Sequence, residues 1–380
     1  MQDNNSNFLM AVVLSLGVLL GWQFFVVEPR LAEERARQLA AADEIAAFAE
    51  NQGTGASPES ELRAPDITGA PTAAGTAPAP STKPANNDAF ADSPRLKIET
   101  EQLSGSIALM GARFDDLILA DYAESLAADA PRQRILQRAN EYGHWQVHHG
   151  WIGAEGANVT LPGPTSLWRV VDGTVLTPTS PVTIAHTTPE GVEFRQRIEV
   201  DNNFMFTITH SARNNTSASL TLYPFAQISR TGRPQTSNLF ILHEGAIGFF
   251  GEEGLNELDY DDLIDERVVS KQAATGWLGI TDKYWATAII PPQDVSFSAR
   301  FTGDSANDRA GEVFRGDYLL AERAIAAGDE TVLVTRVFAG AKVVDLVDGY
   351  ADEGITRFDL LIDWGWFYFL TKPMFRALQF

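Results

Sequence analysis

The sequence predicts a mainly β protein with one N-terminal transmembrane helix, a flexible tether, a large antiparallel β-sandwich and short C-terminal helices. Three observations predict this fold class. An uncharged apolar run of about 20 residues stands near the N-terminus. A stretch rich in Pro, Ala and Thr follows, and from Arg95 onward apolar and polar residues alternate with a period of two. We expect the last helix to be an amphipathic segment at a membrane interface.

The apolar run, residues 8–27, has the length and composition of a transmembrane helix. It holds no charged residue, and at about 1.5 Å per residue it spans a hydrocarbon core of about 30 Å. A cleaved signal peptide is the alternative, but residues 1–7 carry no Lys or Arg and no small-residue cleavage site follows directly. We expect a cytoplasmic N-terminus, residues 1–7, and then a membrane anchor. The anchor residues are Phe8, Leu20, Trp22, Phe24 and Phe25.

The arginines that follow this run complicate its orientation. Arg30, Arg35 and Arg37 lie just after it, and the residues before it have no basic side chain. The positive-inside rule would therefore place the C-terminal side in the cytoplasm, and the interleaved glutamates count little in that rule. This pattern opposes an exported sandwich.

Residues 28–94 are predicted to form a helical stub and a disordered tether. Residues 28–50 are rich in Ala, Glu and Arg, which favour helix. The following stretch turns to Pro, Ala, Thr, Gly and Ser, which cannot bury enough apolar surface to fold. A tether of this length has an end-to-end distance of roughly 35–40 Å, so the next domain can swivel above the membrane.

The net charge and the absence of cysteine argue against several classes of binding partner and site. The formal net charge is −21 and the pI is about 4.6, which speaks against nucleic acid and against electrostatic docking on an anionic lipid surface. The chain has no cysteine, so it has neither disulfides nor thiolate metal ligands. We expect no cofactor.

The β pattern is clearest in the middle of the chain. Residues 192–200 alternate, 201–203 break the run, and the alternation resumes over 204–209. We expect a turn at 213–216 and a new strand from Leu220. Further strands are predicted at 182–185, 276–280, 286–290, 295–301 and 331–338, and one helix at 341–350. The sandwich is expected to span residues 95–350.

Two histidine-containing pairs are candidate chemical sites. His148 and His149 could bind a metal, but adjacent strand residues point to opposite faces and no third ligand stands nearby. His243 and Glu244 could form an acid/base pair, but these residues are also adjacent, so their side chains would point to opposite faces of a strand. We therefore assign no catalytic residue and predict that the chain is not an enzyme.

Charged side chains on the predicted sheet are interpreted as solvated. Arg195 and Arg197 share one face of a strand, where they face solvent or bind an anion. An acidic stretch over residues 257–266 is a solvated loop or short helix, with partner docking as the alternative. The sequence has no phosphate-binding glycine motif, nucleophile elbow or zinc signature.

The stretch from Asp363 to Phe380 combines aromatic and basic residues, as a membrane–water interface favours. Read as a helix, its basic and apolar side chains fall on different sides, and the proline lies in the first turn. An ordinary C-terminal helix docked on the core is the alternative. The interfacial residues are Trp364, Trp366, Phe369, Lys372, Pro373, Phe375 and Arg376.

Several segments, in their order and spacing, resemble the Oxa/Alb/YidC family of membrane protein insertases in its Gram-negative form. With the N-terminal anchor and tether, the resemblance covers essentially the whole chain. The matching segments are residues 163–169 (GPTSLWR), 176–178 with 181–183, 191–195, 222–228 (LYPFAQI), 242–248 (LHEGAIG), 276–285 (GWLGITDKYW), 363–366 (DWGW) and 371–375 (TKPMF).

The resemblance implies a fold and a location. It implies an N-in first helix in the bacterial inner membrane, a periplasmic β-supersandwich similar to mutarotase-like folds, and a C-terminal core of five transmembrane helices. That core inserts and helps to fold integral inner-membrane proteins through a hydrophilic groove. The implied partners are nascent inner-membrane proteins, the Sec translocon with its SecDF accessory, and the lipid bilayer.

The sequence departs from the family by stopping before that core. We therefore expect residues 351–380 to be the truncated start of the core, and these 380 residues alone not to insert a client. The main alternative is a periplasmic carbohydrate-binding or carbohydrate-modifying sandwich on a membrane anchor. A membrane-tethered scaffold unrelated to insertion is the third hypothesis.

Overall fold

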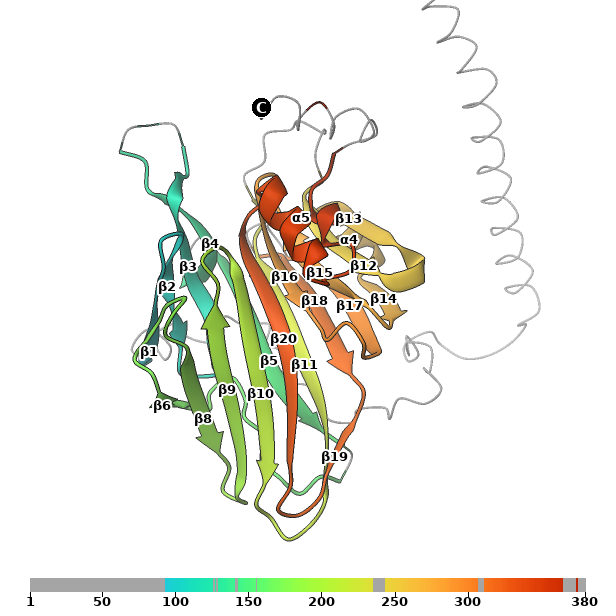
Figure 1. Cartoon of the computed structure of the whole chain (residues 1–380). Helices are drawn as coiled ribbons and strands as arrows, with labels where there is room; N and C mark the ends of the chain where they lie inside the picture. Colours follow the sequence, from blue (N-terminus) through green and yellow to red (C-terminus); the bar gives the residue numbers. More distant parts are fainter. Residues whose placement is uncertain are drawn as a thin grey trace, which may run out of the picture. The chain divides into compact units, whose positions relative to one another are not determined.

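The computed structural model describes residues 93–125, 127, 129–140, 143–154, 156–234, 243–306, 311–364 and 374. Strands dominate this part of the chain and helices are few and short, which confirms the mainly β prediction. Figure 1 shows the strands gathered into two layers. The predicted anchor, tether and most of the interfacial segment lie outside the described residues.

The larger sheet, in the described residues, has eleven strands. Its order is β14-β17-β18-β11-β5-β4-β3-β2-β1-β7, and β19 pairs with β11. The strands pair antiparallel, as β11 does with β5 and β18, and a short parallel pair joins β1 to β7. The bounds are β1 Arg95–Glu99, β2 Leu103–Ala108, β3 Arg113–Ala123, β4 Arg132–Asn140, β5 Gly143–Gly153, β7 Val175–Leu176, β11 Leu220–Thr231, β14 Val268–Ala273, β17 Phe297–Asp304, β18 Val313–Leu320 and β19 Arg323–Ile325.

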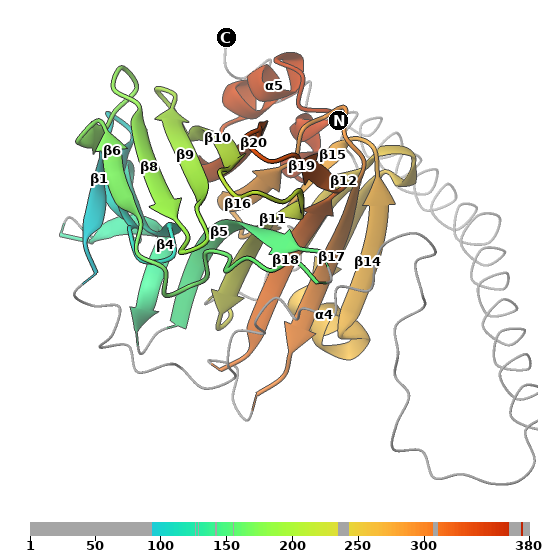
Figure 2. The ribbon, with the colours of Figure 1, turned by 90° about the horizontal axis from the view of Figure 1, so that it is seen from below.

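The smaller sheet has nine strands among the described residues, in the order β13-β12-β15-β16-β20-β10-β9-β8-β6. Its long central strands β10 and β20 pair antiparallel over nine residues. Figure 2 shows the two sheets from below. The bounds are β6 Arg169–Asp172, β8 Val182–Thr187, β9 Val192–Val200, β10 Met205–Asn214, β12 Gly245–Phe250, β13 Leu255–Asp259, β15 Gly276–Thr281, β16 Trp285–Ile290 and β20 Glu330–Ala341.

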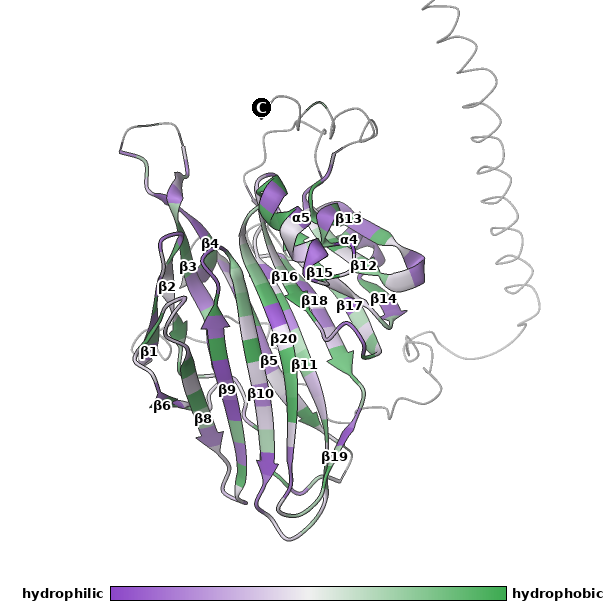
Figure 3. Ribbon diagram, viewed as in Figure 1, coloured by the Kyte–Doolittle hydropathy of each residue, from purple (hydrophilic) through white to green (hydrophobic). Residues whose placement is uncertain are grey.

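The core lies between the two sheets because alternate side chains of each sheet point inward. In β9 every second residue from Val192 to Val200 is buried, and the same alternation runs along β11. Figure 3 shows the resulting bands of hydropathy along β9. Phe114 on β3 meets Phe206 on β10 edge to face, with ring centroids 5.5 Å apart. One buried apolar cluster thus joins both layers.

Short helices cover part of the smaller sheet. Helix α5 (Val344–Asp352) and the 3₁₀ helix η3 (Phe358–Leu361) follow β20. The Phe358 ring lies 5.3 Å from Trp277 on β15 and 5.5 Å from Phe338 on β20. The Tyr350 hydroxyl donates to Asp201 Oδ2 at 2.5 Å. Because these helices cover its outer side, β15 is buried at every position.

Two further helical segments precede β14. The 3₁₀ helix η2 spans Gly251–Glu253, and α4 spans Tyr260–Glu266. The Asp259 carboxylate caps α4 by accepting from the backbone N–H groups of Asp261 and Asp262, both at 2.8 Å. The acidic stretch over 257–266 is thus the end of a strand and a short helix. Its apolar side chains Tyr260 and Leu263 are buried.

The predicted strands agree with the structure, apart from several boundaries. The strand predicted at 295–301 runs from Phe297 to Asp304. The turn predicted at 213–216 starts later, because β10 continues to Asn214, whose side chain bonds to the backbone of Ala218 and Ile325. The helix predicted at 341–350 runs from Val344 to Asp352, since Ala341 still pairs with β16. None of the described helices is long and apolar enough to cross a bilayer.

Candidate functional site where the chain leaves the sandwich

Asp363 and Trp364, at the end of the described range 311–364, lie beside the segment that precedes β12. The backbone N–H of His243 donates to Asp363 Oδ2 at 3.2 Å. Trp364 is half-buried at this point. We call this neighbourhood the exit site: His243, Glu244, Glu257, Asp282, Lys342 and Asp363, with Arg230 paired to Asp282. The site matters because Trp364 begins the predicted interfacial residues.

His243 and Glu244 do not form the acid/base pair considered above. His243 Nε2 donates to the backbone oxygen of Ala246 at 2.9 Å. Glu244 Oε1 instead accepts from the backbone N–H of Lys283 at 3.1 Å. Gly245, the first residue of β12, has φ +148°, and a Cβ there would lie 2.2 Å from the Leu258 backbone oxygen. The His243 side chain therefore bonds to β12 and the Glu244 side chain to the β15–β16 turn.

A buried ion pair joins Asp282 of the exit site to Arg230. Arg230 Nη1 on β11 contacts Asp282 Oδ1 at 2.6 Å, and both side chains are close to nine-tenths buried. The Arg230 guanidinium also lies over the Trp145 ring, 4.3 Å from its centroid. Burial by itself would lower the pKa of Arg230, but Asp282 and Tyr260 raise it above its ordinary value. Arg230 therefore stays charged and joins β5, β11 and the β15–β16 turn.

Lys342, directly after β20, is the second cation of the site. Its ammonium donates to Thr281 Oγ1 at 2.9 Å. Burial lowers the pKa of Lys342 to about 8, although Asp282, Asp363 and Glu244 act in the opposite direction.

The carboxylates of the exit site are crowded. Burial, reinforced by Asp282, raises the pKa of Glu244. Burial also raises the pKa of Glu257, with Asp363 adding to the rise and His243 opposing it. All four carboxylates therefore act on Lys342, and two of them, Asp282 and Glu244, also act on Arg230. The charged side chains of the exit site thus come from segments far apart in the sequence and lie close together.

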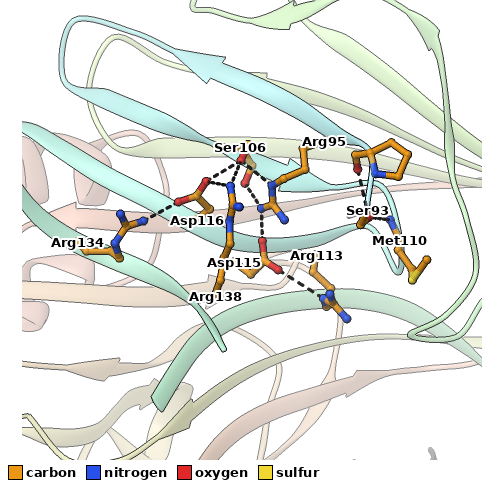
Figure 4. Close-up of polar contacts among 10 residues, drawn as sticks. Ser93, Arg95, Ser106, Met110, Arg113, Asp115, Asp116, Arg134 and Arg138 are labelled. Carbon is orange, nitrogen blue, oxygen red and sulfur yellow. Dashed lines mark hydrogen bonds and ion pairs between the residues drawn. The ribbon is translucent and has the colours of Figure 1, made fainter. Parts of the chain in front are cut away.

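A second charged cluster ties β1 to β4 (Figure 4). Asp116 accepts from Ser106 Oγ at 2.7 Å and from Arg134 and Arg138, both at 2.6 Å. Asp115 pairs with Arg95 and with Arg113. Burial alone would raise the pKa of Asp116, but Ser106, Arg138 and Arg134 lower it below its ordinary value. We call these residues the β1–β4 network.

His148 and His149 point to opposite faces of β5, as the strand geometry predicts. Burial and then Arg113 lower the pKa of His148 to about 4. His149 faces the core, with its ring 5.0 Å from that of His210 on β10. Burial lowers the pKa of His210 to about 3, and His210 Nε2 bonds to Thr335 Oγ1 at 2.9 Å. No group of three metal-ligating side chains occurs in the described part of the chain.

The other charged candidates lie on the surface. Arg195 and Arg197 are exposed on β9, where they pair with Glu193 at 3.1 Å and Glu199 at 2.5 Å. These contacts agree with the interpretation of a solvated face.

The described domain matches a known protein family. The profile of the YidC periplasmic domain matches residues 95–377. This chain belongs to the YidC periplasmic domain family. The matched range begins at the first residue of β1 and runs past Asp363, so the exit site lies inside it.

Curated relatives of this YidC-family chain match along its whole length. The membrane protein insertase YidC of Methylobacterium radiotolerans is 40% identical over 399 residues, and that of Sinorhizobium medicae is 38% identical over 382 residues. Both alignments cover 100% of this chain and 62% of the relative. The chain therefore spans about three-fifths of the length of the curated relatives it matches.

Solved structures offer a more distant likeness. A galactose mutarotase related enzyme from Lactobacillus acidophilus aligns with a TM-score of 0.47 and 12% identity, covering 66% of this chain and 100% of that one. A galactose mutarotase-like protein from Lactobacillus casei aligns with a TM-score of 0.41. Likenesses at this level carry no functional argument.

Sequence reasoning missed most of the exit site, although one signal was present. Arg230 stands two residues after Ile228, on the side of β11 that alternation marks as buried. His210 likewise follows Phe206 and Ile208 on the buried side of β10. A polar residue at an apolar position of a strand is the signal that would have found both.

Proposed function

We propose that this chain is the membrane-anchored periplasmic part of a membrane protein insertase in the bacterial inner membrane. The observation that carries the proposal is the match to relatives named membrane protein insertase YidC over the full length of the chain. The family profile over residues 95–377 supports it independently. The activity would assist insertion and folding of integral inner-membrane proteins, alone or with the Sec translocon.

The proposal divides the chain as the sequence predicts. Residues 1–7 would lie in the cytoplasm, 8–27 would span the membrane, and 28–94 would form a helical stub and tether. Residues 95–350 would form a periplasmic supersandwich, and 351–380 would introduce the membrane core. The anchor residues from Phe8 to Phe25 and the interfacial residues from Trp364 to Arg376 keep their predicted roles here.

In this role the exit site would set the direction in which the chain leaves the sandwich. Asp363 is held by the His243 backbone, and Lys342 faces the same carboxylates. His243 and Lys342 come from segments far apart in the sequence. Contacts with both would restrict the movement of residues 363–364 relative to the sandwich. A fixed exit would keep the interfacial helix at a constant orientation to the sandwich.

The proposed partners are nascent inner-membrane proteins, the Sec translocon and SecDF. A photoreactive side chain placed at the exposed positions Val268 and Val332 of the full chain tests them, since both side chains are more than half exposed. We expect covalent adducts with nascent chains or with Sec subunits. Val337 is 0% exposed, and the same probe there is the matched control that reaches no partner.

The result that would overturn the proposal is equally specific. It is the absence of such adducts at both exposed positions, together with binding of a defined sugar at a Kd below about 1 mM. That outcome would instead support the carbohydrate-binding alternative.

A further inference from the structure

The turn between β15 and β16 presents an aromatic and basic surface. Tyr284 at its tip is 57% exposed, among the most exposed large apolar side chains in the described residues. The Lys283 ammonium lies 5.1 Å from the Tyr284 ring centroid. Behind them Trp285 contacts Tyr284 at 5.7 Å and Tyr122 of β3 at 5.5 Å between centroids. We call Lys283, Tyr284 and Trp285 the aromatic turn.

The aromatic turn lies at the same end of the sandwich as the exit site. The Lys342 backbone N–H donates to the backbone carbonyl oxygen of Tyr284 at 2.9 Å, and the Lys283 backbone N–H donates to Glu244 Oε1. Trp285 pairs with Ala341, the last residue of β20, from which the chain enters α5. Figure 1 shows α5 and this end of β16 together, opposite the end where β19 lies.

The chemistry of this end suits a lipid headgroup layer. Tyr and Trp place an apolar ring in the interface and a polar group in water, and Lys extends its ammonium outward. The chain continues from Trp364 with Gly-Trp-Phe-Tyr-Phe and then the basic residues Lys372 and Arg376. Two aromatic and basic segments thus start from one end of the fold.

We propose that the aromatic turn rests on the headgroup layer of the bilayer and forms a second membrane contact beside the interfacial segment. The inference rests on the proposed function, which places this end toward the membrane. Glu244, Glu257, Asp282 and Asp363 lie close by, so attraction to anionic lipid does not drive the contact. Zwitterionic lipid is therefore sufficient, and added salt changes the contact little.

The cysteine-free chain allows a direct test, because one introduced cysteine is the only thiol. The full chain carrying Y284C is labelled with an environment-sensitive fluorophore and reconstituted in phosphatidylcholine–phosphatidylethanolamine vesicles. A nitroxide on the lipid headgroup should quench this label at least roughly threefold more than one at V332C. Val332 is 55% exposed near the start of β20, about 30 Å along the strand from Ala341 at about 3.3 Å per residue.

A second reporter leaves the aromatic turn intact. Glu124 is exposed just after β3, two residues beyond Tyr122, and E124C carries the same label. Quenching of the E124C label by the headgroup nitroxide should fall when Y284S is added, because loss of the Tyr284 ring weakens the contact between the aromatic turn and the lipid.

The outcomes separate this inference from the insertase proposal. A chain that floats with vesicles but shows equal, low quenching at 284 and 332 overturns the contact and leaves the anchor and the insertase role standing. Energy transfer between labelled chains in place of quenching would also overturn it, since a second copy would then cover the turn.

Discussion

At the scale of single residues, the unusual feature of this sandwich is its buried polar side chains. His149 and His210 occupy core positions of β5 and β10, and neither ring nitrogen of His149 has a hydrogen-bond partner in the described residues. A cavity of about 10 Å³ lies beside His210 and Thr335. Because both rings are buried in the core, protonating either one would place a charge among apolar side chains.

The neutral state of His210 predicts how stability changes with acid. Its pKa in the folded chain is about 3, and its ordinary value is 6.5, so the unfolded chain binds more protons between these values. The free energy of unfolding therefore falls as the pH drops below about 6.5, and His210 alone contributes about 2–3 kcal/mol of that loss by pH 4.5. Urea unfolding of H210Q at pH 7 and pH 4.5 should show a loss smaller by this amount.

The control for this prediction keeps the titrating ring and removes its partner. T335V leaves His210 Nε2 without the Thr335 hydroxyl, which should lower stability by about 1–3 kcal/mol at both pH values. Its pH dependence should match the parent chain. An unchanged pH dependence in H210Q would show that His210 does not carry the effect.

The Arg230–Asp282 pair makes a different prediction. Removing one member leaves the other charge buried, so D282N should cost about 3 kcal/mol of unfolding free energy. Adding R230M to D282N should restore part of that loss, because no unpaired charge then remains. A double-mutant cycle by chemical denaturation measures the coupling. Additive effects of the two substitutions would mean that the pair does not act as a unit.

At the scale of elements, the sequence predicted what depends on neighbours along the chain. Period-two alternation located β9, β10 and β20, because each strand has one face in the core. The order of strands in each sheet does not follow from such patterns. β11 lies between β5 and β18, so which side chains meet across the sheet is set by long-range pairing.

The exit site was missed for this reason. Arg230, Asp282 and Lys342 come from β11, the β15–β16 turn and the end of β20, and no local spacing relates them. His243 and Glu244 stand out in the sequence because they are adjacent, yet each side chain bonds to a different segment. Local patterns therefore indicate elements better than they indicate sites.

The β1–β4 network predicts a local effect. Asp116 holds β2 through Ser106 and β4 through Arg134 and Arg138, so D116N should loosen this part of the larger sheet. Because both arginines are partly exposed, we expect a loss of about 1–3 kcal/mol in unfolding free energy. Hydrogen exchange should accelerate in β2–β4 and stay unchanged in β12–β16.

The matched control is the exposed pair of Lys97 and Glu99 on β1. E99Q removes a carboxylate whose side chain is 60% exposed, so exchange and stability should change little. Equal effects of D116N and E99Q would contradict a structural role for the network.

At the scale of the whole molecule, two features of the chain predict opposite orientations. Arg30, Arg35 and Arg37 follow the apolar run within the window that the positive-inside rule counts, and they favour a cytoplasmic sandwich. Membership of the YidC periplasmic domain family favours a sandwich on the outer side. The charge rule weakens when a long folded domain follows the anchor, because such domains translocate largely regardless of charge.

We therefore expect the sandwich to lie outside the inner membrane. V332C, exposed on β20, should react with a membrane-impermeant maleimide in intact spheroplasts, and N4C before the apolar run should react only after permeabilisation. Replacing the three arginines by asparagine should leave this pattern unchanged, since removing positive charge only favours export. Protection of V332C in intact spheroplasts would show that the arginines decide the orientation, and the periplasmic assignment would then fail.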